Sequence, residues 1–119
     1  MAEYDYAKGV AEGHHIGAGW RPMVLELIEL CKKHNVSVHQ IKEKFGGLRF
    51  YTSAAPQGLQ QLIWAAEMLS NRICEECGAN GEHRDVDWIK TLCDRCFEKA
   101  RLFLKGSEDH LVEHDSGAQ

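Results

Sequence analysis

The chain has 119 residues, of which 44% are hydrophobic and 27% are charged, and its formal net charge is −4. This length and composition predict one compact globular domain and exclude collagen-like and broadly disordered chains. The acidic balance argues against a protein that simply coats nucleic acid. No apolar run is long enough to span a bilayer, and the N-terminal residues do not have the pattern of a secretory signal, so we expect a cytoplasmic protein.

Residues 1–19 contain four glycines and no regular period, which predicts a flexible lead-in. The domain itself is expected over residues 20–106. Its first helix is predicted at about 22–34, because Pro22 suits the first helical position and Asn35 offers a stop. The apolar face of this helix follows the i, i+3, i+4, i+7 pattern and comprises Val24, Leu27, Ile28 and Cys31, the last as a small buried hydrophobic residue.

Residues 40–53 predict a β-hairpin with a Gly-Gly turn at 46–47, because primed two-residue turns need positive φ angles. Placing Phe45 opposite Leu48 divides the side chains between two faces. One face is mostly apolar and is expected to join the core: Ile41, Glu43, Phe45, Leu48, Phe50 and Thr52. The other face is polar: Gln40, Lys42, Lys44, Arg49, Tyr51 and Ser53. Glu43 is the exception on the apolar face, where it either pairs with a buried base or marks the edge of the sheet.

A second helix is predicted at about 57–72. Its buried stripe is expected to comprise Leu59, Leu62, Ile63, Ala66, Leu69 and Ile73, extended by Trp64 and Met68. A third helix is predicted at about 93–105, with Gly106 as its C-cap and with Cys96, Ala100, Phe103 and Leu104 on its inner face. Residues 107–119 hold four acidic residues and few apolar ones, which predicts a disordered acidic tail.

Four of the five cysteines form two C-x2-C pairs, Cys74 with Cys77 and Cys93 with Cys96, separated by fifteen residues. An odd number of cysteines without a signal peptide makes a poor disulfide framework. The spacing instead fits a tetrahedral zinc site, in which each short turn directs two thiolates at one metal. A redox-active dithiol pair and cysteines that bind no metal are the alternatives. Zinc held by four thiolates would bring the charge of the folded protein to about −6.

The residues around the cysteines predict the form of this site. Residues 74–78 have the pattern of a zinc knuckle, whose tight turn is expected to direct backbone N–H groups at the sulfurs. Residues 84–92 can form a hairpin, and Cys93 and Cys96 open a helix whose N-terminal dipole favours thiolates. The order of knuckle, hairpin and ligand-bearing helix resembles the treble-clef class of zinc fingers. Four cysteines leave no open coordination position, and no catalytic acid–base set is present, so we expect a structural metal and no enzymatic activity.

Histidines offer weaker candidates for metal ligands. His83 could replace one cysteine, although a surface histidine in a loop is the simpler interpretation. His14 and His15 lie in a Gly-rich stretch without a cysteine or carboxylate at a useful spacing, so we expect no second metal site there.

The polar face of the predicted hairpin carries Lys42, Lys44 and Arg49, with Tyr51 among them. Such a set could bind phosphate groups and stack a base. The alternatives are contact with a protein partner and a solvated face without a function, since half-buried antiparallel sheets have a solvated side on which Lys and Arg are common.

Four stretches between residues 19 and 97 carry a resemblance to a known family: Gly19 to Pro22, Ile41 to Tyr51 with the core Lys-Glu-Lys-Phe-Gly-Gly-Leu-Arg-Phe-Tyr, Leu62-Ile63 with Ala66-Glu67 before Cys74, and Trp88 to Cys93. Through them the chain resembles a widespread family of small bacterial and prophage zinc-binding proteins for which no activity is established. The resemblance implies a bacterial or bacteriophage origin and a cytoplasmic setting. Small phage-borne proteins of this size often bind and block a host macromolecule.

These features together predict an α+β fold: helix, hairpin, helix and a treble-clef-like zinc module at 74–105, packed as one domain. The expected function is the binding of a protein partner, as an inhibitor or adaptor of host nucleic-acid or defence machinery. The alternative is direct binding of nucleic acid through Lys42, Lys44, Arg49 and Tyr51. The net charge favours the protein partner, because an acidic body repels the phosphates that the basic face would attract.

Overall fold

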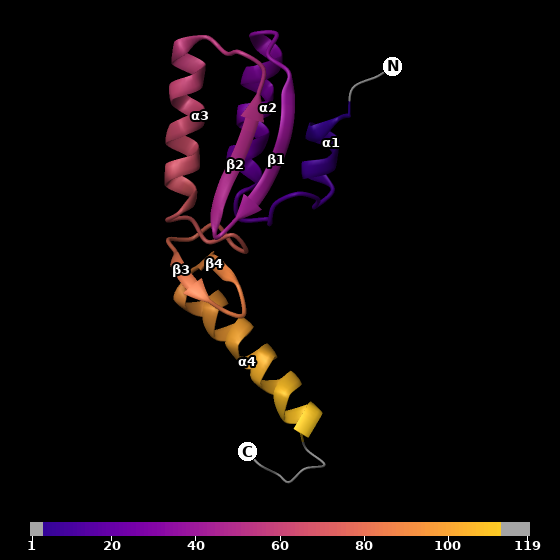
Figure 1. Ribbon diagram of the computed structural model, residues 1–119, viewed down its shortest axis with the longest axis vertical. Helices are drawn as coiled ribbons and strands as arrows, with labels where there is room; N and C mark the ends of the chain where they lie inside the picture. The colour runs from indigo at the N-terminus through magenta and orange to yellow at the C-terminus, as the bar shows by residue number, and fades with distance from the viewer. Residues whose placement is uncertain (1–3, 113–119) are drawn as a thin grey trace.

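The computed structural model describes residues 4–112 and the side chains of residues 4–104. In chain order its elements are α1 (Tyr6–Ala11), α2 (Arg21–Lys33), β1 (Val38–Lys44), β2 (Gly47–Thr52), α3 (Gln57–Ser70), β3 (Glu82–Asp85), β4 (Ile89–Leu92) and α4 (Asp94–Val112). The strands form two separate antiparallel pairs, β1–β2 and β3–β4. The fold is α+β, as the sequence predicts (Figure 1). Among the helices of the described residues, none has both the length and the apolar character needed to cross a membrane.

The N-terminal region contains regular structure, and the prediction of a flexible lead-in over 1–19 is wrong for the residues described. Asp5 caps α1 by accepting the N–H of Lys8 at 3.0 Å. Val10 is 0% exposed, and Ile16 also lies in the main core. A helix of six residues is too short to show a period, so its burial against α2 is what forms it.

Helix α2 agrees closely with its prediction. It has Pro22 in its first turn, and its predicted face, Val24, Leu27, Ile28 and Cys31, is buried. Burial also raises the pKa of the Cys31 thiol. The chain leaves the helix at Asn35, whose φ of +57° ends the helical path.

The β1–β2 hairpin has a register that differs from the prediction by two residues. Lys44 pairs with Gly47 and Glu43 with Leu48, so the turn residues are Phe45 and Gly46. Their φ angles, +53° and +82°, are those of a type I′ turn. Glu43 accepts the N–H of Gly46 at 2.7 Å, which explains an acidic residue on the apolar face.

A shift of two residues leaves every strand side chain on its predicted face, because the side-chain period of a strand is also two. Ile41, Leu48 and Phe50 are therefore buried in the core as expected. Phe45 is not part of that face, because the turn leaves it 66% exposed. Figure 1 shows the hairpin lying across α2, with α3 beside β2 and α1 beside β1.

Helix α3 packs along the free edge of β2. The N–H of Leu48 donates to Ser70 Oγ, and the N–H of Phe50 donates to Glu67 Oε2, both at 2.8 Å. These bonds satisfy amides that an edge strand otherwise leaves exposed.

The buried stripe of α3 is narrower than predicted and comprises Leu59, Ile63, Ala66 and Ser70. The expectation of burial is wrong for four large apolar residues, Leu62, Trp64, Met68 and Leu69, which are exposed. The buried residues of the helix form one stripe against β2 and α2, so apolar residues on its other sides have no partner in the described part of the chain. Ile73, beyond the helix, packs against the core as expected.

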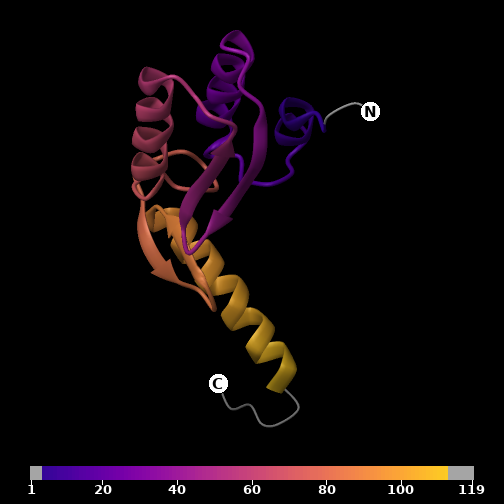
Figure 2. The ribbon, with the colours of Figure 1, turned by 45° about the horizontal axis from the view of Figure 1, so that its top comes forward.

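The C-terminal part of the chain forms a second, smaller cluster below the first (Figures 1 and 2). Cys74, Val86 and Leu92 are its buried members, and Cys96, Phe97, Ala100 and Leu104 of α4 pack against them. Phe103, predicted on this inner face, is 74% exposed.

Helix α4 begins at the predicted place but ends later. It continues through Gly106 to Val112, so the predicted C-cap at 106 and a disordered tail over 107–112 are wrong. A glycine costs only about 1 kcal/mol inside a helix and does not by itself end one. The rest of the predicted tail, residues 113–119, lies outside the described residues.

Candidate metal centre

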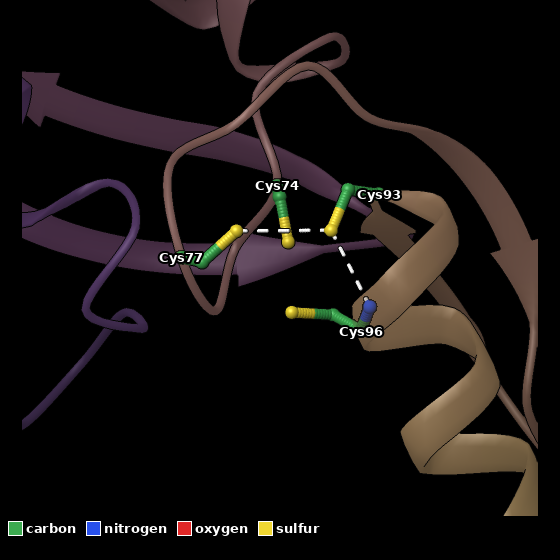
Figure 3. Close-up of side chains that lie close together, drawn as sticks. All are labelled: Cys74, Cys77, Cys93 and Cys96. Carbon is green, nitrogen blue, oxygen red and sulfur yellow. Dashed lines mark hydrogen bonds between the residues drawn. The ribbon is translucent and has the colours of Figure 1, made fainter.

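The four cysteines of the two C-x2-C pairs come together at the junction between the two clusters. Cys74 and Cys77 lie on the loop that follows α3, whereas Cys93 precedes α4 and Cys96 lies in its first turn. Their Sγ atoms all lie within 4.8 Å of one another, and those of Cys77 and Cys93 are 3.7 Å apart (Figure 3). The site can hold a metal ion, and no other group of potential metal ligands occurs in the part of the chain that the structure describes.

The loop that carries the first pair is closed by backbone hydrogen bonds. The Cys74 N–H donates to the Ala79 carbonyl at 2.7 Å, and the Gly78 N–H donates to the Cys74 carbonyl at 3.0 Å. The tight turn expected at Gly78 is present, with a φ of +86°, and the N–H of this glycine is used within the loop. The knuckle positions its thiols by backbone geometry.

The second pair receives a direct bond to sulfur. The Cys96 N–H, in the first turn of α4, donates to Cys93 Sγ at 3.3 Å. This bond lowers the pKa of Cys93 to about 7. Burial, followed by contact with the neighbouring thiols, raises the pKa of Cys96 to about 12. The thiol pKa values of the two cysteines in this turn are therefore very different.

Residues from the N-terminal half hold the knuckle in place. The Gly19 N–H donates to the Glu75 carbonyl at 2.8 Å, and the indole N–H of Trp20 donates to the Ile73 carbonyl at 2.8 Å. A side chain at Gly19 would overlap the carbonyl oxygen of Cys74. The sequence analysis did not predict this role. The signal that could have indicated it is the Gly-Trp pair immediately before α2.

The tip of the β1–β2 hairpin contacts the same module from another side. The Thr91 hydroxyl donates to the Gly46 carbonyl at 2.6 Å, and both groups are buried. A Cβ on Gly46 would lie 3.2 Å from Thr91 Oγ1 and from the ring of His83. The hairpin turn thus packs directly onto β3 and β4.

Glu75 is a buried acid between the two ligands of the knuckle, and it too was missed. Its side chain accepts the N–H of Thr91 at 2.8 Å and lies 3.9 Å from Lys90 Nζ. Burial raises its pKa to about 7. Its bond to Thr91 ties the knuckle to β4.

The base of α4 is held by Arg84 of β3. Its guanidinium contacts Asp94 at 2.6 Å and lies 4.6 Å from the centre of the Phe97 ring. This pair of contacts couples the β3–β4 hairpin to the helix that carries Cys96.

The histidines considered as ligands have other partners. His83 Nε2 lies 2.8 Å from Asn71 Oδ1, and His15 Nε2 lies 2.8 Å from the Tyr4 hydroxyl. Neither belongs to the sulfur cluster.

The predicted partner-binding residues share one face of the β1–β2 hairpin. Lys42 pairs with Arg49 across the strands, and Lys44, Arg49 and Tyr51 are exposed. None of the three basic residues forms an ion pair within the described residues. Their role in binding stays a prediction.

Comparisons with known proteins return no significant match, whether with protein-family models, curated sequences or solved structures.

Proposed function

We propose that the four cysteines bind one zinc ion and that the protein acts, without catalysis, by binding a protein partner. The observation that carries the zinc assignment is the approach of the four sulfurs to within 4.8 Å of one another. Zinc–sulfur bonds of about 2.3 Å in a tetrahedron separate the sulfurs by about 3.8 Å, close to the 3.7 Å between Cys77 and Cys93. Four sulfurs also suit iron, so metal analysis separates the two.

A structural role follows from the donor set. Four thiolates complete the coordination of zinc and leave no position for a water molecule or a substrate. The order of knuckle, β3–β4 hairpin and α4 resembles a treble clef, in which the metal holds a small module together. Such thiolates persist in a reducing compartment, which supports a cytoplasmic protein.

The case for a protein partner rests on the surface. Leu62, Trp64, Met68 and Leu69 expose large apolar side chains on α3, and such exposure marks interaction sites in soluble proteins. The resemblance to bacterial and prophage proteins supports a role as an inhibitor or adaptor of host nucleic-acid or defence machinery. The negative net charge supports a protein partner over a nucleic acid.

A second candidate function is direct binding of nucleic acid. It is favoured by the exposure of Lys44, Arg49 and Tyr51 on one hairpin face, together with the half-buried Lys42. If three bases contact phosphates, the logarithm of the binding constant falls with the logarithm of salt concentration at a slope of roughly −2 to −3. Lys44→Ala would reduce this slope by about one, whereas Lys8→Ala, on α1, would leave it unchanged. Absence of binding to DNA and RNA at low salt would exclude this function.

The zinc proposal is tested by metal removal and by Cys77→Ser. We expect one zinc per chain in the native protein, and unfolding of at least residues 74–105 when the metal is removed, since structural zinc contributes about 10–16 kcal/mol of apparent binding free energy. Circular dichroism melting with and without a chelator measures this, and Cys31→Ser, outside the cluster, is the control for zinc content. An unchanged melting curve after verified metal loss, or efficient disulfide exchange by the metal-loaded protein, would contradict the proposal.

A further inference from the structure

The first residue of the β1–β2 turn is a phenylalanine that neither the backbone nor the packing explains. Phe45 has a φ of +53°, which strains a bulky residue, and type I′ turns favour asparagine or glycine at this position. Its ring is 66% exposed, so burial compensates for little of the strain. The contact of Gly46 with Thr91 accounts for the position of the turn, but it does not require an aromatic residue there. Strained residues of this kind are typical of functional sites.

The Phe45 ring lies beside the polar face of the hairpin. That face carries Lys42, Lys44, Arg49 and Tyr51. Lys44 Nζ is 5.7 Å from the centre of the Phe45 ring, within the range of a cation–π contact. Tyr51 is 46% exposed. The face therefore presents two exposed aromatic rings together with three basic side chains.

The two rings lie near opposite ends of this face. The level of Lys44 and that of Tyr51 are four residues apart along the strands, which is about 13 Å. Lys42 and Arg49 face each other across the strands between these levels. A flexible chain of phosphates that runs along the hairpin would therefore pass the basic residues on its way from one ring to the other.

The hairpin contributes no acidic side chain to this face. Glu43 is the one acidic residue of residues 38–53, and it lies on the opposite face, where it accepts the N–H of Gly46. None of the three basic residues forms an ion pair within the described residues. In Figure 1 the hairpin lies in front of α2, and no other helix or strand covers its near side. Since the Debye length is about 8 Å at physiological salt, the local positive charge attracts a polyanion that comes close.

We propose that this face binds single-stranded nucleic acid. One base stacks on Phe45 and another on Tyr51, and the three basic residues hold the phosphates. Charge alone would suit any polyanion, whereas the rings favour nucleic acid, because every base offers a π-face for stacking. A duplex keeps its bases stacked on one another and would leave both rings without a partner. This inference rests on the second candidate function above and specifies its ligand.

The class of ligand is tested with the full chain and a fluorescent single strand of about 12 nucleotides, by fluorescence anisotropy at low salt. A duplex of the same sequence and polyglutamate should each compete at least about tenfold more weakly, because they cannot stack on the rings. Equal competition by the duplex or by polyglutamate would overturn the single-strand assignment, and in the second case the face would suit an acidic protein. Absence of binding to either form of nucleic acid would overturn the second candidate function as well.

The stacking contact is tested by Phe45→Asn, which removes the ring and gives the turn a residue that its φ favours. Binding of the single strand should weaken about 5–150-fold, although the variant should unfold at no lower temperature than the wild type. Phe103→Asn on α4 is the matched control, because its ring is 74% exposed and lies outside the hairpin, and it should bind as the wild type does. Phe45→Tyr keeps a ring and should also retain binding.

An abasic probe separates stacking from charge. An oligonucleotide of the same length whose sugars carry no bases keeps its phosphates, so it should bind the wild type and Phe45→Asn equally. Tyr51→Leu should likewise weaken binding of the base-carrying strand only. If Phe45→Asn binds that strand as tightly as the wild type, or weakens both probes equally, the stacking inference is overturned, while binding of phosphates by the basic residues would still stand.

Discussion

Gly19 shows at the scale of one residue how the knuckle depends on a segment far away in the sequence. It lies just before α2, yet its N–H bonds to the Glu75 carbonyl, and its Cα faces the backbone of the loop between Cys74 and Gly78. A side chain has no room there. The knuckle is therefore shaped from outside as well as by its own hydrogen bonds.

Gly19→Ala should destabilise the protein by about 1–3 kcal/mol, because the added methyl group forces the knuckle backbone to move. Gly58→Ala is the matched control, since nothing lies within 4 Å of a Cβ built there. In α3 this control should be neutral or stabilising by up to about 1 kcal/mol. Thermal unfolding followed by circular dichroism measures both, and equal melting temperatures for the two variants would contradict the expected clash.

The β1–β2 hairpin shows at the scale of an element how packing selects a register. A turn at either Phe45-Gly46 or Gly46-Gly47 satisfies the strand pattern, since both keep Ile41, Leu48 and Phe50 on one face. The structure adopts the first, although it puts a phenylalanine at a φ of +53°. Gly47 then becomes the first residue of β2, with the Asn71 side chain 3.1 Å from the position of its missing Cβ.

Phe45→Asn should stabilise the protein by about 0.5–1 kcal/mol, because asparagine tolerates positive φ and the Phe45 ring is largely exposed. Tyr51→Asn is the control on the same hairpin, where the backbone is extended and the exchange should stabilise nothing. Chemical denaturation measures the difference in unfolding free energy, with the same slope against denaturant concentration expected for each variant. A loss of stability in Phe45→Asn would mean that the ring contributes packing that outweighs its backbone strain.

At the scale of the whole molecule, the sulfur cluster joins the two halves of the chain. Trp20 and Gly19 contact the knuckle, and the hairpin tip contacts Thr91 of β4. A metal ion bound there would therefore stabilise more than its own module. Loss of the metal should weaken each of these contacts.

Hydrogen exchange with and without a chelator tests this coupling. Amide protection of Gly19 should fall together with that of the knuckle, because its N–H donates to the Glu75 carbonyl. Protection at the hairpin tip should fall as well, because the Thr91 hydroxyl of β4 holds the Gly46 carbonyl. Protection in the middle of α2, around Ile28, should fall much less, since that part of the helix packs in the main core. Unchanged protection at Gly19 after metal loss would show that the two halves are held together by other contacts.

The sequence by itself determined the elements with strong local signals. Helix α2, the two faces of the hairpin and the start of α4 follow from spacing alone, because periods of 3.6 and 2 report burial directly. The four ligands of the candidate metal site follow from two C-x2-C pairs for the same reason: each pair is local, and its turn defines which way two thiols point. The α+β class follows from the order of these elements.

Only the tertiary structure decided what depends on contacts between distant segments. Three features depend on a surface supplied from elsewhere in the chain: the burial of α1, the register of the hairpin and the narrow buried stripe of α3. No short stretch of sequence indicates where such a surface will lie. The clearest case of a burial that the sequence could not predict is that of the exposed apolar residues of α3, Leu62, Trp64, Met68 and Leu69. The one charged residue of this helix is Glu67, and it bonds to β2. The helix therefore has no charged face that would indicate which side meets the solvent. The position of Gly19 and Trp20 on the knuckle is of the same kind, because more than fifty residues separate Trp20 from the Ile73 carbonyl to which its indole bonds.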